Sequence, residues 1–272
     1  MIRLVASDVD GVLYIRGSLV TRTLTLIKQL QDSGICCTVI TGMGVKRIHH
    51  KLSSFHANCP MVIEDGGRIV TPNGETIVEY PLPETEIIKL AHFLPTSRVS
   101  MAAFSCLDDN QYVCLVNDIE GERMVKSGLE AGAIRQITND VSLFLGLALR
   151  HGCTRVTVKP REGCSFEPPS TLRCAQNEYW YNLTAQGVDK GTALVKLCDL
   201  LAVPLHETLV IGNDYNDIPM FKQPIRYKIA VGSYSTELTA LASHHVESPE
   251  QVSDTLAEIF RTHLVRWRTP EG

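Results

Sequence analysis

Two aspartates stand two positions apart near the N-terminus, directly after a short apolar run. The segment at 7–13 reads SDVDGVL, and it places Asp8 and Asp10 at the end of an expected strand. Side chains two apart begin on the same face of a strand, and Gly11 lets the chain turn there. Two carboxylates that lie so near each other favour a bound cation or a shared proton. One carboxylate can then act as a nucleophile while the other moves a proton, although a solvated acidic turn is the alternative interpretation.

Three further polar segments follow apolar runs or begin a helix pattern. Thr41-Gly42 follows the run ICCTVI, Lys190 begins an amphipathic stretch, and GNDYND at 212–217 follows the run at 208–211. In a doubly wound sheet such positions share one edge. The edge would then carry carboxylates, a hydroxyl, a backbone amide beside a glycine, and an ammonium group.

This set of groups suits a phosphate monoester. Mg²⁺ prefers carboxylate oxygens together with phosphate and water. The Thr41 hydroxyl can donate to phosphate, Gly42 allows close backbone approach, and Lys190 can neutralise charge on the transferred group. Taken singly, each segment has a structural alternative: Thr41 as a turn residue, Lys190 as a solvated lysine after an N-cap at Asp189, and 212–217 as a polar turn.

Composition restricts the class of protein further. The chain has 272 residues, of which 44% are hydrophobic and 21% charged, and its net charge is −4. These values are typical of a globular protein, and they give no basic field for nucleic acid or anionic membranes. The nine cysteines are scattered without a CxxC pair, which favours reduced thiols. With no membrane-length apolar run and no leader pattern, we expect a cytoplasmic protein that binds a small molecule. The oligomeric state is not indicated.

Alternating apolar runs and amphipathic stretches at both ends of the chain predict the elements that carry these residues. Near-continuous apolar runs are typical of parallel strands covered on both faces. Strands that alternate with helices predict a doubly wound parallel-sheet α/β core. Expected strands lie at 2–7, 35–40, 61–63, 208–211 and 226–231, and expected helices at 21–33, 45–55, 190–202 and 253–263.

Thr41 and Lys190 are 149 positions apart, which is too long for a loop, and the segment between them has a pattern of its own. This pattern predicts an inserted α+β module, with a core at 1–82 and 185–272 and a cap at 83–184. The run VSLFLGLAL inside an expected helix at 140–151 also fits a strand. The other expected cap elements are a helix at 84–94 and strands at 98–105, 111–116, 155–159 and 179–184. Tyr179, Trp180 and Tyr181 are interpreted as part of the last of these strands, with one ring facing a substrate as the alternative.

The order of the four segments resembles the haloacid dehalogenase (HAD) superfamily of aspartate-nucleophile phosphatases. SDVDGVL is similar to its first motif, Thr41-Gly42 to its second, GVDKG to its third, and GNDYNDIPMF to its fourth. The long insertion, with GGRI and PNG in it, resembles the Cof-type subgroup with an α+β cap. The EDGG turn and residues 209–221 are similar to archaeal phosphoglycolate phosphatases and to sucrose-phosphate-phosphatase-like enzymes.

The resemblance implies a Rossmann-like HAD core and a Mg²⁺-dependent phosphatase of a small phosphorylated metabolite, such as a sugar phosphate or a phospho-acid. In it, Asp8 would attack phosphorus to form an aspartyl-phosphate, and Asp10 would protonate the leaving alcohol. A phosphomutase and a non-catalytic module that binds phosphate or metal remain alternatives. The expected catalytic residues are Asp8, Asp10 and Lys190; the expected phosphate ligands are Thr41, Gly42, Lys190 and Asn216; the expected metal ligands are Asp8, Asp10, Asn213, Asp214 and Asp217.

Two positions depart from the family pattern. Asn213 stands where the family usually has a metal-binding aspartate, and Met43 stands where arginine often follows Thr-Gly. Asn213 can bind a metal through its amide oxygen, at a cost in charge, or Asp214 or Asp217 can take that role. We expect Asp217, near the start of the following helix, to contribute more than Asp214.

Overall fold

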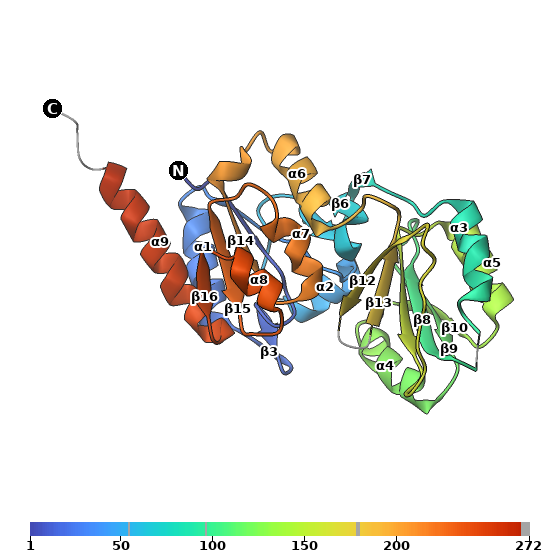
Figure 1. Ribbon diagram of the computed structural model, residues 1–272. Coiled ribbons are helices and arrows are strands. Elements are labelled where there is room, and N and C mark those ends of the chain that lie inside the picture. Colours follow the sequence, from blue (N-terminus) through green and yellow to red (C-terminus); the bar gives the residue numbers. More distant parts are fainter. Residues whose placement is uncertain (54, 96, 178–179, 268–272) are drawn as a thin grey trace.

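A parallel β-sheet forms the core of the computed structural model, which describes residues 1–53, 55–95, 97–177 and 180–267 (Figure 1). The strand order is β16-β15-β14-β1-β4, and every neighbouring pair is parallel. The predicted doubly wound α/β core is therefore confirmed. These strands are β1 (Leu4–Ser7), β4 (Cys36–Val39), β14 (Thr208–Gly212), β15 (Tyr227–Val231) and β16 (His244–Val246).

Apolar side chains leave both faces of this sheet, which explains why its strands read as continuous apolar runs. On β1, Val5 points into one layer of the core, whereas Leu4 and Ala6 point into the other. The layer at Val5 is covered by α1 (Thr21–Asp32), α2 (Val45–Lys51) and α9 (Val252–Trp267). The opposite layer is covered by α6 (Lys190–Leu200), α7 (Ile218–Phe221) and α8 (Thr236–Leu241).

The helix that carries Lys190 begins at a well-defined cap. The Asp189 side chain accepts a hydrogen bond from the Thr192 amide at 2.8 Å, and the Thr192 hydroxyl accepts one from the Asp189 amide at 3.0 Å. This reciprocal pair satisfies amides that the first helical turn leaves without partners. The predicted N-cap at Asp189 is confirmed, and it fixes the first helical residue, Lys190, at the edge of the sheet.

A second sheet lies beside the core, at the end of the molecule opposite the N-terminus and α9 (Figure 1). Its order is β10-β9-β8-β11-β13-β12, and its pairs are antiparallel except β9 with β10. All of these strands fall inside 83–184, and the mixed sheet confirms the α+β character of the cap; its exact bounds stay a prediction. The strands are β8 (Val99–Ser105), β9 (Tyr112–Val116), β10 (Ile134–Thr138), β11 (Arg155–Pro160), β12 (Arg173–Asn177) and β13 (Trp180–Thr184).

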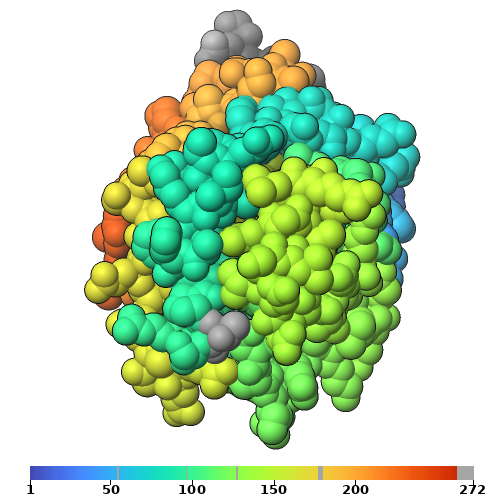
Figure 2. All heavy atoms as spheres, turned by 90° about the vertical axis from the view of Figure 1, so that its right-hand side faces the viewer, coloured from blue at the N-terminus to red at the C-terminus, as the bar shows by residue number. Residues whose placement is uncertain are grey.

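Helices cover the two faces of the cap sheet differently. On the outer face, α3 (Glu84–Lys89), η2 (Leu90–His92) and α5 (Val141–His151) lie side by side (Figure 2). On the other face, α4 (Ile119–Glu130) packs with Met101, Ala103 and Tyr112. The sheet therefore presents its inner face, with α4 along it, toward the core.

The run at 141–149 belongs to the helix expected at 140–151 and not to a strand, because Asp140 caps α5 by accepting a hydrogen bond from the Ser142 amide at 2.8 Å.

Several other predicted elements differ from those observed. The helix from Val45 ends at Lys51 rather than at 55, and α4, β10 and β12 were not predicted. Tyr179 lies outside the described residues. The nine cysteines are free thiols, as expected.

The short elements connect the two sheets and close the loops of the core. The hairpin of β6 and β7 turns at Pro72-Asn73-Gly74, as predicted. Within the described part of the chain, no helix has the length and apolar character needed to cross a membrane. These elements are β2 (Tyr14–Ile15), β3 (Ser18–Leu19), β5 (Met61–Ile63), η1 (Glu64–Gly66), β6 (Arg68–Val70), β7 (Thr76–Glu79), η3 (Leu205–Glu207), η4 (Tyr215–Asp217) and η5 (Pro249–Gln251).

Candidate active site

Asp8 lies directly after β1, at the carboxyl edge of the core sheet. Its amide donates to the Ile211 carbonyl at 2.9 Å, so the ladder between β1 and β14 continues to this residue. The carboxylate is 6% exposed, and its Oδ1 accepts a hydrogen bond from Lys190 Nζ at 2.8 Å. Lys190 reaches this position from the first turn of α6. The structure thus brings together two residues that the sequence separates by most of its length.

Burial and charge act against each other at this pair. Burial raises the pKa of the Asp8 carboxyl to about 8, although the Lys190 ammonium beside it acts in the opposite direction. Burial alone would lower the pKa of Lys190, but Asp217 and Asp8 outweigh it and raise that pKa. Lys190 is therefore held as a cation, and Asp8 needs further positive charge nearby to be ionised at neutral pH.

Asp217 lies on the far side of Lys190, away from solvent. Its Oδ1 accepts from Lys190 Nζ at 2.7 Å, and its Oδ2 accepts from the amides of Asn213 at 2.9 Å and Asp214 at 3.2 Å. The carboxylate is fully buried, and both oxygens have partners. These contacts engage both oxygens with protein donors, and our placement of Asp217 among the metal ligands stays a prediction. In this structure Asp217 holds Lys190 and the loop at Asn213.

Three polar groups meet beside the β1 end: Asp8 Oδ2, the Asp10 carbonyl and the Asn213 side-chain amide. With its nitrogen turned toward them, the Asn213 amide donates to Asp8 Oδ2 at 3.3 Å and to the Asp10 carbonyl at 3.0 Å. Turned by 180°, the amide would present its oxygen to the same place, where a cation could bind all three oxygens. Carboxylate, carbonyl and amide oxygens are the donors that Mg²⁺ prefers, so these residues fit that ion. Gly11 (φ +77°) keeps this corner open, because a Cβ there would collide with the Asn213 amide.

The Asp10 side chain points away from those oxygens. Its Oδ1 accepts a hydrogen bond from Lys51 Nζ at 2.7 Å, and more than half of the side chain is exposed. Lys51 itself lies over the Tyr14 ring, 4.8 Å from the ring centroid. Asp10 therefore offers its carbonyl to the candidate metal site and its carboxylate to the open space beside Asp8.

Donor groups line the opposite side of Asp8. The Thr41 hydroxyl accepts from the Met43 amide at 3.2 Å and keeps its own proton to donate. The Gly42 amide makes no hydrogen bond within the described residues, and a Cβ at this position would lie 2.8 Å from Arg155 Nη1. Asn216 donates one N–H to Asp65 at 3.0 Å, which leaves its second N–H available. Such a set of free donors suits a phosphate group.

A cavity of about 470 Å³ extends from these residues to the cap. Of the predicted site residues, seven line it, whereas Lys190 and Asp217 stand behind Asp8. Asp214 is one of these seven residues, and its Oδ1 accepts a hydrogen bond from the Tyr215 amide at 2.6 Å. The volume is in the range of small-molecule sites. The seven residues are Asp8, Asp10, Thr41, Gly42, Asn213, Asp214 and Asn216.

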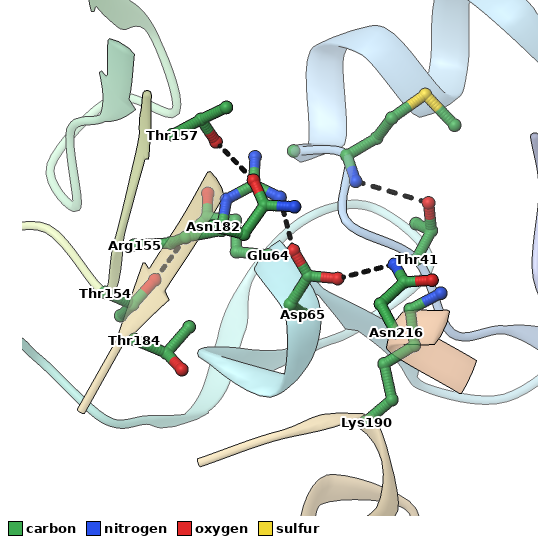
Figure 3. Close-up of polar contacts among 12 residues, drawn as sticks. Thr41, Glu64, Asp65, Thr154, Arg155, Thr157, Asn182, Thr184, Lys190 and Asn216 are labelled. Carbon is green, nitrogen blue, oxygen red and sulfur yellow. Dashed lines mark hydrogen bonds and ion pairs between the residues drawn. The ribbon is translucent and has the colours of Figure 1, made fainter. Parts of the chain in front are cut away.

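A buried polar network closes this cavity where core and cap meet, and the sequence analysis missed it. Asp65 accepts from Asn216 of the core and from Arg155 Nη1 of the cap at 2.7 Å (Figure 3). Burial alone would raise the pKa of Asp65, but Arg155, Lys190 and Asn216 together outweigh burial and lower that pKa. Glu64 accepts a hydrogen bond from the Thr154 hydroxyl of the cap and, at 2.7 Å, from Arg68.

Glu64 and Asp65, which carry this network, belong to the EDGG segment, and the sequence predicted only a turn there. Glu64 and Asp65 form a short 3₁₀ turn with positive φ angles of 55°, a conformation that costs energy for residues other than glycine. Both are almost fully buried. The available signal was the charge itself, because the EDGGR sequence directly follows a buried strand.

The sequence matches the haloacid dehalogenase-like hydrolase family over residues 5–142 and 166–259. The chain belongs to this family, which confirms the predicted family and the prediction of an enzyme. It is 24% identical over 230 residues to a phosphoglycolate phosphatase of Thermoplasma acidophilum, covering 83% of this chain and 84% of that protein. It is 25% identical over 259 residues to an HMP-PP phosphatase of an Enterobacter species, covering 90% and 89%.

The fold is shared with a solved phosphatase of the haloalkanoate (HAD) enzyme superfamily from Bacteroides thetaiotaomicron. The two structures superpose with a TM-score of 0.73 at 18% identity, and the match covers 95% of each chain. The similarity extends over core and cap together. The predicted fold class is confirmed for the whole described chain.

Proposed function

We propose that this protein is a Mg²⁺-dependent phosphatase that hydrolyses a small phosphorylated metabolite through an aspartyl-phosphate at Asp8. One observation carries the proposal: Asp8 follows β1 at the floor of the cavity, with Lys190 on one carboxylate oxygen and the Asn213 amide beside the other. The donors of Thr41 and Gly42 lie on the same cavity wall. This arrangement suits in-line attack of a carboxylate on a phosphoryl group.

In the first step, an Asp8 oxygen forms a bond to phosphorus while the bond from phosphorus to the leaving oxygen breaks. Asp10 gives its proton to the leaving alkoxide, so that an alcohol departs. Lys190 offsets negative charge at Asp8, and the free donors of Thr41, Gly42 and Asn216 hold the phosphoryl oxygens. In the second step, Asp10 takes a proton from water, which attacks phosphorus and releases Asp8.

The cation would be held by Asp8 Oδ2, the Asp10 carbonyl and the Asn213 amide oxygen. When bound, Mg²⁺ supplies positive charge that lowers the energy of the ionised Asp8 and of the phosphoryl oxygens. The role of Asp217 in our proposal is to keep Lys190 charged and directed at Asp8.

We also propose that residues 83–184 select the substrate and that 1–82 and 185–272 perform the chemistry. The cavity supports this division, since the reacting residues lie on the core and the facing wall comes from the cap. Names of relatives point to phosphoglycolate and HMP-PP as compounds to test, together with sugar phosphates and other short phospho-acids.

The test is release of inorganic phosphate from an aryl phosphate and from this panel, with Mg²⁺ and with a chelator. We expect multiple turnovers that need Mg²⁺. Acid quenching during turnover should add the mass of one phosphoryl group to the peptide that contains Asp8. A single burst without turnover would support a binding module, and transfer of phosphate within the substrate would support a mutase.

A further inference from the structure

Arg47 faces the cavity without a carboxylate partner. Among the described residues, three other cations stand at the site, and each is paired: Lys190 with Asp8, Arg155 with Asp65, and Lys51 with Asp10. Arg47, from α2, lines the cavity and makes no hydrogen bond or ion pair with any described residue. A guanidinium group does not lose its proton in proteins. Its charge therefore stays available in the cavity.

The position of Arg47 separates it from the phosphate donors. Burial raises the pKa of the Cys114 thiol to about 12, and the Arg47 charge acts against this rise. Arg47 acts in the same direction on the pKa of Tyr112, which burial raises. Both residues belong to β9 of the cap, so the Arg47 guanidinium lies at the cap side of the cavity. Asp8 and Thr41 form the floor of the cavity, at the edge of the core sheet.

The cap wall beside Arg47 is mostly apolar. Its hydroxyl and amide groups are few. Thr157 donates to Asn182 Oδ1 at 2.8 Å, and the Tyr112 hydroxyl accepts from the Gly44 amide at 2.8 Å. A substrate with many hydroxyl groups would leave several of them without partners there, which costs free energy. An apolar or flat body fits this wall better. The wall comprises Met101, Ala103, Cys114, Met124, Val125, Ile134 and Trp180.

We propose that Arg47 binds a second anionic group of the substrate, whose body between the two anionic groups is apolar. This inference rests on the proposed function, because it assumes that the first anionic group is the phosphate over Asp8. Guanidinium binds carboxylate and phosphate alike through two parallel hydrogen bonds. The second group is therefore an oxyanion, either a carboxylate or another phosphate.

The test uses a matched series of aryl phosphates: 4-carboxyphenyl phosphate, its uncharged 4-carboxamide and unsubstituted phenyl phosphate. Hydrogen bonds to charged groups contribute about 1.5–3 kcal/mol, so kcat/KM for the carboxylate should exceed that for the amide by about 10- to 100-fold. Arg47→Met should remove this preference through KM and leave kcat on phenyl phosphate unchanged. Lys46→Met is the control, since Lys46 is the adjacent cation of α2 and does not line the cavity.

Phenylene 1,4-bisphosphate, compared with 4-carboxyphenyl phosphate, distinguishes a phosphate from a carboxylate as the second group. Equal kcat/KM values for the carboxylate and the amide in the unmodified enzyme would overturn the inference, while turnover of phenyl phosphate would keep the proposed function. Calorimetry of 4-carboxybenzylphosphonate binding to the unmodified enzyme and to Arg47→Met tests the role of Arg47 without any turnover. Binding that Arg47→Met leaves unchanged would also overturn it.

Discussion

Lys190 and Asp217 form an ion pair of 2.7 Å in which neither side chain is exposed to solvent. The same ammonium donates to Asp8 at 2.8 Å. One cation thus lies between two carboxylates, one of which is enclosed and one of which faces the cavity. Asp217 carries the second charge without competing for the substrate, which leaves Asp8 to react.

The Lys190–Asp217 pair gives the first prediction. Asp217→Asn should lower kcat by more than about tenfold, because Lys190 then has only Asp8 as a counter-charge and loses its fixed position. The Mg²⁺ concentration for half-maximal activity should change less than in Asn213→Ala. Denaturant unfolding is needed beside the assay, since breaking a buried pair costs about 3–5 kcal/mol. A large rise in the Mg²⁺ requirement with kcat intact at saturating Mg²⁺ would instead indicate that Asp217 is a metal ligand.

The nucleophile gives the second prediction. Asp8→Asn keeps the size and polarity of the side chain but removes the attacking carboxylate, so kcat should fall by at least about three decades. Phosphate release measured at saturating substrate decides it. A variant that retains more than about a tenth of the original kcat would exclude Asp8 as the nucleophile, because the expected loss is about three decades.

Asp10 divides its roles between backbone and side chain, which gives the third prediction. Asp10→Asn keeps the carbonyl that faces Asn213, so Mg²⁺ binding measured by calorimetry should persist. The proton donor is lost, and the rate should fall by roughly two to four decades. The opposite pattern, with weakened Mg²⁺ binding and a normal rate at saturating Mg²⁺, would contradict the assignment.

The fourth prediction concerns the irregular position 213. Asn213→Asp replaces an amide that can donate to Asp8 Oδ2 and the Asp10 carbonyl with a carboxylate that repels both, so the metal-free protein should unfold at a lower temperature. Mg²⁺ should then raise the unfolding temperature more in this variant than in the unmodified protein, because tighter binding to the folded state stabilises it more. Asp214→Asn is the matched control on the same loop. A variant whose unfolding temperature no longer responds to Mg²⁺ would exclude a metal at residue 213.

Asp65 gives a prediction on pH. Its pKa is lowered in the folded protein, because Arg155, Lys190 and the hydrogen bond from Asn216 together outweigh the effect of burial. A carboxyl with a lowered folded pKa contributes stability that is fully present above its unfolded pKa of 3.8 and is lost as the pH falls through the lower folded value. Urea unfolding of Asp65→Asn should therefore depend less steeply on pH below about 4 than that of the unmodified protein. Equal slopes in this range would show that the pair does not couple to pH.

The parallel core and the order of its site residues were predictable because both depend on local patterns. Apolar runs predicted β1, β4, β14 and β15, and the shared edge of parallel strands brought Asp8, Thr41 and Asn213 together. In the cap, α4 and β12 were missed. The sequence of α4 is as amphipathic as that of α1, so its signal was present and was overlooked. For β12, packing against the neighbouring strand decides the structure.

The contacts of charged groups were harder to predict than their positions. Asp217 ends beneath Lys190 rather than in the cavity because its own loop donates two amides to it. Asp65 and Arg155 are 90 residues apart, and their pairing depends on how the cap docks. Such pairings follow from tertiary geometry, which spacing along the chain does not encode.

The pairing of β1 with β14 joins Leu4 to Thr208, near opposite ends of the chain. During synthesis on a ribosome, β1 emerges early and pairs first with β4, while its other edge has no neighbour until the whole insertion has been made. Such distant contacts slow folding, and an unpaired central strand is prone to wrong associations in the meantime. Asp8, whose amide donates to the Ile211 carbonyl, becomes fixed among the last parts of the nascent protein. Prematurely terminated chains that lack this strand would therefore be inactive and prone to aggregate.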